Sequence, residues 1–298
     1  MKPVIVVGYD QTPSSERALI EAGREAARRN AAVSVVHSFR WIPAATPAAY
    51  VPMSVELDLQ ESAQTTADAG VKVLRESYPG MAVESRVISG PAADALAEAS
   101  RDADLLLLGN RGRGGFAGLL LGSVSMRTLG FASCPTMVVR GLERQPFDEV
   151  VLALDLEDPA DEVLDFAFAQ ASLRGARLHV INVWHLDWIG ATAYPPTAGG
   201  RDDPNDLDTA RAQAAADIHA GLETIVHPWQ AKYPNVRLHV EVADGTPSAV
   251  LVAATEHADL IVAGAHRRGD GHLGMRLGPV VHALLHHSGC PVAVVPRS

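Results

Sequence analysis

Cysteine is nearly absent from this chain: its 298 residues include two, Cys134 and Cys290. So few cysteines cannot build the disulfide framework of a small secreted domain, and a reducing cytoplasm is the simplest setting for them. We therefore expect a cytoplasmic protein that is held together by a hydrophobic core. Each cysteine precedes a proline at the start of a last strand, which favours packing over nucleophilic chemistry.

Long apolar runs and blocks of basic residues are missing as well. No run reaches the ~20 apolar residues that cross a bilayer, and the N-terminus lacks the apolar stretch of a signal peptide. The net charge is −10, without a run of lysine and arginine. Because nucleic-acid binding needs a basic footprint, we expect neither a membrane nor a nucleic acid as a partner. The small basic clusters at Arg111/Arg113 and Arg267/Arg268 suit a small anion better.

What the sequence does contain is an internal repeat. Asp10 and Asp155 lie 145 residues apart in similar segments, and similar pairs continue to the end of the chain. A period of this length is too long for a solenoid unit and fits a duplicated domain. We expect one domain at residues 1–141 and a second at residues 147–298, joined by the short polar linker Gly141–Phe147.

Each half alternates unbroken apolar runs with helical patterns. The first half has expected strands at Val4–Val7, Val33–Phe39, Ala82–Ile88, Leu105–Leu108 and Thr136–Val139, and expected helices at Ser14–Arg29, Leu57–Tyr78, Pro91–Ser100 and Ser123–Ala132. The second half has strands at Val150–Ala153, Leu178–Val183, Arg237–Val242, Leu260–Ala263 and Val292–Val295, and helices at Asp158–Leu173, Asp206–Tyr233, Pro247–Glu256 and Pro279–His287. This pattern predicts the α/β class, with two tandem, doubly wound, five-stranded parallel sheets.

The loop after the fourth strand, Gly109–Ser125, carries most of the chemistry. Its glycines let the backbone approach a ligand closely, and Gly122 opens the next helix. The amides of Ser123, Val124 and Ser125 should then be free to bind an anion, and the hydroxyls of Ser123 and Ser125 can donate as well. No Gly-Lys-Ser/Thr ends the loop, so it is not a Walker loop, and the helix begins too late for a dinucleotide-binding motif.

The spacing of these residues resembles the ATP-binding motif of universal stress proteins. Gly109 is followed by two residues, Gly112, nine residues and then Gly122-Ser123, and the Val7–Asp10 opening fits the same pattern. Both halves carry parts of it, so the chain resembles a tandem universal stress protein. That resemblance implies an adenine nucleotide α-hydrolase-like fold of strand order 3-2-1-4-5, ATP as ligand with Mg²⁺ as companion, and domains or subunits that pair through the last strand.

The same resemblance assigns the first-half site. Asp10 would contact the adenine or ribose side, Ser38 would line the adenine pocket, and the loop would hold ribose and phosphates. The implied nucleotide-binding residues are Gly8, Asp10, Ser38, Gly109, Arg111, Gly112, Arg113, Gly122, Ser123, Val124 and Ser125.

The second copy departs from the motif. Pro279 stands where Ser123 stands in the first half, which removes an amide and a hydroxyl while suiting a helix start. Arg267 replaces Gly112, and Ala153 replaces Gly8. The residues left to bind a nucleotide there are Asp155, Gly264, Arg267, Arg268 and Gly278. We expect weak, altered or absent ATP binding in the second half.

Three functions stay open on the sequence alone. The first is a nucleotide-dependent regulatory protein of the stress response, because a phosphate cradle stands without an evident general base or nucleophile. The second is a slow Mg²⁺-dependent ATP hydrolase in which Asp10 or a loop serine assists water. The third is a nucleotide-free interaction module. We assign no catalytic residue and no metal ligand, and we leave open whether the two domains pair within one chain or the chain forms a homodimer.

Overall fold

A computed structural model describes residues 3–40, 53–112, 120–141, 145–184, 204–267 and 275–297. The first repeat contains β1 (Val4–Gly8), α1 (Pro13–Arg29), β2 (Ala32–Phe39), α2 (Met53–Ser77), β3 (Val83–Ser89), α3 (Ala92–Ala99), β4 (Leu105–Gly109), α4 (Ser123–Leu129) and β5 (Thr136–Val139). The second contains β6 (Glu149–Ala153), α5 (Asp161–Arg174), β7 (Arg177–Trp184), α7 (Pro204–Lys232), β8 (Arg237–Asp244), α8 (Pro247–Ala254), β9 (Leu260–Arg267), β10 (Met275–Arg276), α9 (Pro279–His287) and β11 (Val292–Arg297). None of the described helices is long and apolar enough to span a membrane.

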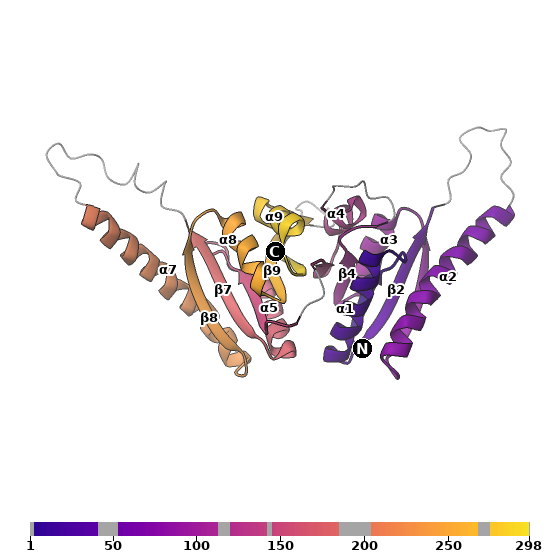
Figure 1. Cartoon of the computed structure of the whole chain (residues 1–298), viewed down its shortest axis with the longest axis horizontal. Coiled ribbons are helices and arrows are strands. Elements are labelled where there is room, and N and C mark those ends of the chain that lie inside the picture. Colours follow the sequence, from indigo (N-terminus) through magenta and orange to yellow (C-terminus); the bar gives the residue numbers. More distant parts are fainter. Residues whose placement is uncertain are drawn as a thin grey trace, which may run out of the picture.

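The described strands form one continuous sheet across both repeats (Figure 1). Its order is β3-β2-β1-β4-β5-β11-β9-β6-β7-β8, so each repeat has the order 3-2-1-4-5 with parallel neighbours. The sheet passes from one repeat to the other where β5 and β11 pair in antiparallel fashion, with Met137 opposite Ala293. The expected strand order and the doubly wound α/β class are confirmed.

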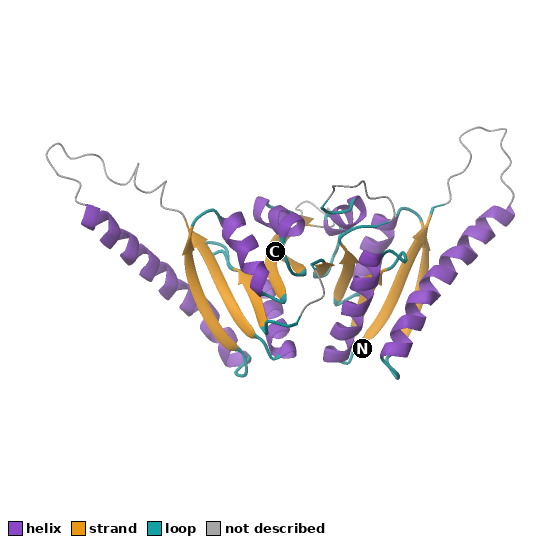
Figure 2. Cartoon of the chain, viewed as in Figure 1, coloured by secondary structure: helices purple, strands orange, loops and turns teal. Residues whose placement is uncertain are grey.

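Both faces of the sheet carry helices, and α2 and α7 lie at the two outer flanks (Figure 2). This double cover follows from the strands, because successive side chains point to opposite faces. Ile5 and Val7 of β1 pack in one core with Leu19 of α1, whereas Val6 packs in the other with Leu129 of α4. All five of these side chains are almost fully buried.

Local signals in the sequence account for the helix ends. Thr12 is the N-cap of α1, where its side chain accepts a hydrogen bond from the Ser15 amide at 3.2 Å and Pro13 follows in the first turn. The helix ends at Asn30 in the left-handed conformation, with φ of 51°. Gly175 ends α5 in the same way at the equivalent position, with φ of 64°.

The largest differences from the expected elements of the second repeat are at the start of α5 and after the expected end of β9. Helix α5 begins at Asp161 rather than Asp158, because Pro159 keeps the residue before it out of the helical conformation. Strand β9 extends to Arg267, and β10 pairs antiparallel with it in a segment that we expected to be a loop. A two-residue strand has no apolar alternation by which a sequence could reveal it.

The two cysteines are reduced and buried. Burial raises the pKa of the Cys134 thiol to about 12, so the thiolate that a nucleophile requires does not form near neutral pH. This agrees with the packing role that the sequence favours.

Candidate functional site

The loops after β1 and β4 meet at one edge of the sheet. The two strands are neighbours, with Ile5 opposite Leu105, and parallel strands end on the same side. The convergence is close: a Cβ added at Gly112 would lie 3.1 Å from Oδ2 of Asp10. The crevice expected outside the carboxyl ends of these strands therefore brings Asp10 and the glycine loop together.

Gly109 lets the end of β4 pass directly against the start of α1. A Cβ at this position would lie 2.6 Å from Ser14 Oγ and 2.7 Å from the Ser14 carbonyl carbon, which is too close for any side chain. The Ser14 hydroxyl uses this contact, because it donates to Asn110 Oδ1 at 2.7 Å and accepts from the Arg111 amide at 3.1 Å. The first residues of the loop are thus fixed to the first helix.

The first turn of α4 is fixed against the same loop. The Gly122 amide donates to the Asn110 carbonyl at 2.7 Å, and a Cβ at Gly122 would lie 3.4 Å from the Arg111 Cα. Gly122 is the N-cap of α4 and has no side-chain cap. The start of the helix is therefore held against the loop by contacts of the backbone.

The amides of Ser123, Val124 and Ser125 have no acceptor among the described residues, since the first hydrogen bond of the helix runs from Met126 to the Gly122 carbonyl at 3.0 Å. Ser123 and Val124 are exposed. Unpaired amides at a helix start carry a partial positive charge. They form a row of donors that is open to an anion.

One expected donor is already engaged. The hydroxyl of Ser125 is buried and donates to the Gly109 carbonyl at 2.7 Å. The hydroxyl proton of Ser125 is used in this bond, although we expected it to be donated to a ligand. The donor that Ser125 offers to a ligand is therefore its amide. The Ser123 side chain stays exposed at the mouth of the site.

The remaining first-repeat candidates have varied surroundings. Oδ1 of Asp10 accepts from the amide and hydroxyl of Thr12, at 3.1 and 2.6 Å, and so shapes the turn before α1. A Cβ at Gly8 would lie 3.1 Å from the Leu96 side chain, so packing alone explains this glycine. Ser38 is half-buried in β2, and Arg111 is exposed. Arg113 lies outside the described residues.

The equivalent cleft of the second repeat is partly filled by the protein itself. It has a volume of about 280 Å³ and is lined by Asp155, Gly264 and Arg297 among others. The Arg297 side chain crosses Gly264, where its Cδ would lie 3.1 Å from an added Cβ. Its guanidinium pairs with Asp158 Oδ2 at 2.8 Å and meets His266 Nε2 at 2.9 Å. A cation of the last strand therefore lies across the second-repeat counterpart of Gly109, whereas Ser14 lies against Gly109 in the first repeat.

The start of α9 also offers fewer donors than the start of α4. Gly278 is its N-cap, and Pro279, which has no amide proton, is the first helical residue. Asp155 accepts from the Glu157 amide at 3.1 Å, and Arg267 ends β9 with an exposed side chain. Arg268 lies outside the described residues.

Comparison with known proteins identifies the family. The model of the universal stress protein family matches residues 1–140 and again residues 146–296. This chain belongs to the universal stress protein family. A universal stress protein of Mycolicibacterium smegmatis is 31% identical to it over 98% of this chain and 97% of its own length.

Two solved structures are similar to this universal stress protein. A universal stress protein from Archaeoglobus fulgidus has the same fold, with a TM-score of 0.69 at 20% identity over 99% of this chain and 98% of its own. Another, solved in complex with cAMP, is 29% identical over 47% of this chain and 97% of its own, with a TM-score of 0.31.

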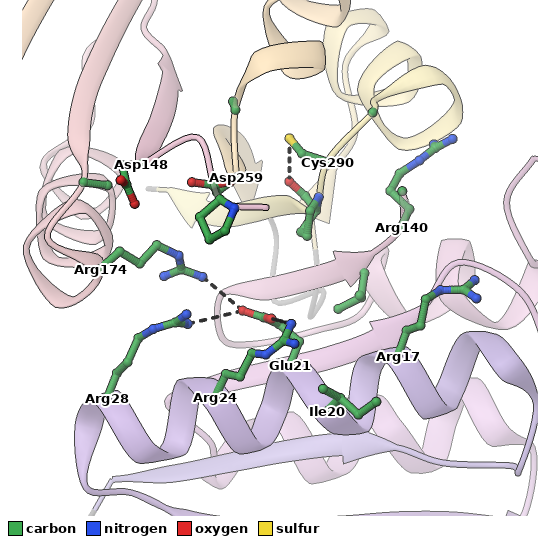
Figure 3. Close-up of a pocket in the computed structure, with 17 residues that line it drawn as sticks. Arg17, Ile20, Glu21, Arg24, Arg28, Arg140, Asp148, Arg174, Asp259 and Cys290 are labelled. Atoms are coloured by element: carbon green, nitrogen blue, oxygen red, sulfur yellow. Dashed lines mark hydrogen bonds and ion pairs between the residues drawn. The ribbon is translucent and has the colours of Figure 1, made fainter. Parts of the chain in front are cut away.

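A pocket of about 390 Å³ lies between the two repeats of this universal stress protein (Figure 3). Arginines of both repeats line it, and three of them pair with Glu21, namely Arg24, Arg28 and Arg174. Arg28 and Arg174 both point at Glu21, at 3.3 and 3.4 Å. Arg140 donates to the His286 carbonyl at 2.7 Å and so caps the end of α9. The ion pair of Arg174 with Glu21 crosses this pocket, so the pocket is a junction between the two repeats.

Glu25 of α1 is the centre of this junction and is fully buried. Its carboxylate meets Arg174 of α5 at 2.6 Å, Arg28 at 2.9 Å and Arg29 at 3.0 Å, and it accepts from Gln170 at 3.2 Å. Burial acts to raise the pKa of Glu25, but these three guanidiniums outweigh it and hold the pKa below its ordinary value. A buried charge is thus compensated across the contact between the repeats.

Proposed function

We propose that this universal stress protein binds ATP in its first repeat and acts as a nucleotide-dependent regulatory protein of the stress response. The row of amides at Ser123–Ser125, which have no acceptor in the part of the chain that the structure describes, is the observation that carries the proposal. Phosphate oxygens are the natural partners of such amides, because the helix dipole adds to their hydrogen bonds. The exposed Arg111 supplies a cation at the same edge.

The neighbouring residues suit the rest of the nucleotide. Asp10 lies beside Gly112, where a glycine leaves room for a ligand to approach the carboxylate. Ser38 lies next to the last residue of the neighbouring strand β2 and would face the adenosine side together with Asp10. Mg²⁺ would accompany the triphosphate and neutralise part of its charge.

The second repeat is expected to bind ATP weakly or not at all. Arg297 lies across Gly264, and Pro279 has removed one amide from the row. With ATP bound in the first repeat and not in the second, the protein would respond to nucleotide through the occupancy of one site. Such a response requires ATP to favour one of two conformations of the loops, since only differential affinity shifts an equilibrium.

Ser123→Pro tests the proposal with little risk to folding. The change copies Pro279, and proline suits the first turn of a helix. It removes one amide and one hydroxyl from the phosphate site. A hydrogen bond to a charged group contributes about 1.5–3 kcal/mol, so we expect ATP affinity to fall roughly 10- to 100-fold while the melting temperature stays close to that of the wild type.

Titration calorimetry with ATP and with cAMP, with and without Mg²⁺, measures the effect. Pro279→Ser is the matched control, because it alters the equivalent position of the other repeat and should leave first-site affinity unchanged. Chromatography of nucleotide released from denatured protein adds a second readout, in which unhydrolysed ATP is expected. ADP alone would favour the hydrolase alternative. Equal ATP affinity in wild type and Ser123→Pro would overturn the proposed site.

A further inference from the structure

We propose that His179, His239 and Glu241 form a binding site for a divalent transition-metal ion of the Zn²⁺ type. Among the described residues, these are three histidine, cysteine or carboxylate side chains whose donor atoms all lie within 4.8 Å of one another. They sit on the sheet of the second repeat, away from the loop that we propose for ATP. The sequence did not suggest them as ligands.

The topology brings the three side chains together. His179 of β7 lies directly opposite His239 of β8, and Glu241 follows two residues later, so all three point to the same face. The two imidazole rings are 4.6 Å apart between centroids. His239 is exposed, and the side chains of Glu241 and His179 are partly exposed. An ion from solvent can therefore reach the cluster.

The donors are arranged for one ion. Nε2 of His179 is 2.7 Å from Glu241 Oε2, and the side chain of Glu241 is 43% exposed. Ligand atoms of tetrahedral Zn²⁺ lie roughly 3.3–3.5 Å apart, given bonds of about 2.0–2.2 Å. Small rotations of the exposed His239 and Glu241 side chains are enough to reach that spacing. Three protein ligands leave at least one coordination position for water.

A carboxylate behind His179 supports the metal-binding reading. Nδ1 of His179 lies 3.0 Å from Glu149 Oε1, on the side of the ring opposite Glu241. Glu149 is held in turn by Arg177, whose Nε donates to it at 2.9 Å. A carboxylate that accepts from the far nitrogen of a histidine fixes the ring and directs the other nitrogen to a metal. This second feature distinguishes the cluster from an ordinary group of surface charges.

The first repeat has the same strands without the cluster. Its equivalents of His179, His239 and Glu241 are Ser34, Glu84 and Arg86, which follow from the matching strand registers. A serine, a carboxylate and a guanidinium do not form a transition-metal site. The donor set therefore belongs to the second repeat alone, as its altered nucleotide loop does.

The ligand types set the class of ion. Two imidazoles and one carboxylate suit Zn²⁺, Cu²⁺ or Ni²⁺, whereas Mg²⁺ prefers oxygen ligands. The competing account is that both ring nitrogens of His179 are used only in hydrogen bonds to Glu149 and Glu241. The two accounts differ in what occupies Nε2. A metal ion displaces the proton from that nitrogen, so its binding is coupled to proton release.

Calorimetric titration of the untagged, chelator-treated full chain with Zn²⁺ decides between them. We expect one Zn²⁺ per chain, a visible absorption band when Co²⁺ is used instead, and no binding of Mg²⁺ at this site. His239→Ala should abolish the band without disturbing the bonds of His179, because His239 makes none of them. Glu149→Gln should weaken Zn²⁺ binding about 10- to 100-fold, as loss of a supporting carboxylate does.

His219→Ala is the matched control. His219 is also a partly exposed histidine near a glutamate, 3.8 Å from Glu223, but it lies on α7 outside the cluster. This variant should bind Zn²⁺ as the wild type does. Absence of stoichiometric Zn²⁺ binding, or binding that His239→Ala leaves intact, would show that the cluster is a hydrogen-bonded histidine only.

Discussion

Glu25→Ala is expected to lower the free energy of unfolding by about 3–5 kcal/mol, because it breaks a buried ion pair by removing one partner. The carboxylate is fully buried and meets three guanidiniums. Without it, Arg174 keeps only 8% of its side chain exposed and retains the more distant Glu21 at 3.4 Å. A buried cation with only this weaker compensation would then lie between the two repeats.

Denaturant unfolding of the full chain at neutral pH measures this loss. Glu98→Ala is the control, because Glu98 also pairs with an arginine on the surface, at 2.8 Å, but both side chains are about half exposed. An exposed pair of this kind contributes about 0–1 kcal/mol. If the two variants lost the same stability, the junction around Glu25 would not be holding the repeats together.

The same residue gives the stability a dependence on pH. The folded pKa of Glu25 lies below its ordinary value, so the unfolded chain binds the proton more readily. The contribution of Glu25 is therefore complete above the unfolded pKa and is lost as pH falls through the folded pKa. We expect the difference in stability between wild type and Glu25→Gln to shrink on acidification below about pH 4.5. A difference that stayed constant into that range would contradict the assignment.

Gly141→Ala is expected to cost about 2–5 kcal/mol of stability. Gly141 follows β5 with φ of +84°, where a side chain costs about 1–2 kcal/mol. An added Cβ would also lie 2.3 Å from the Gly289 carbonyl oxygen of the other repeat. Because backbone atoms on both sides must move apart, the overpacking adds about 1–3 kcal/mol.

Gly175→Ala separates these two costs. Gly175 has a similar φ of +64°, but a Cβ there would meet nothing within 4 Å. It should lose only the backbone cost of about 1–2 kcal/mol. Thermal unfolding of both variants provides the comparison, and equal losses would show that the contact with Gly289 yields without strain.

The sequence predicted the parts of the fold that depend on repeated patterns. Unbroken apolar runs predicted the buried strands. The position of Gly109 and Gly112 after the fourth run predicted a loop that meets Asp10. The predicted start of α5 was wrong by three residues, although Pro159 could have indicated the correct start. The amide row at α4 follows from the Gly-Ser helix start, whereas the bond of the Ser125 hydroxyl to the Gly109 carbonyl depends on how the loop folds back on the helix.

Other features depended on contacts between distant segments. Arg297 belongs to no nucleotide motif, and only the packing of β11 beside β9 shows that it lies across Gly264. His179 and His239 are separated by 60 residues, so spacing along the chain gave no sign of a shared site. One signal was available in the sequence, because the tetrapeptide Arg-Leu-His-Val occurs at both positions. The two copies lie on the neighbouring parallel strands β7 and β8, where their histidines stand opposite each other.

The antiparallel ladder of β5 and β11 has a consequence for how molecules of this protein can associate. Among the described strands, β3 and β8 are the two outermost, and the ladder leaves no unpaired edge in the middle. Any growth of the sheet from one molecule to the next must begin at those margins. Both margins carry charged residues, Glu84 and Arg86 on one and Arg237 and Glu241 on the other. Charges on edge strands oppose sheet-to-sheet joining, so the arrangement protects the chain against fibrous polymerisation.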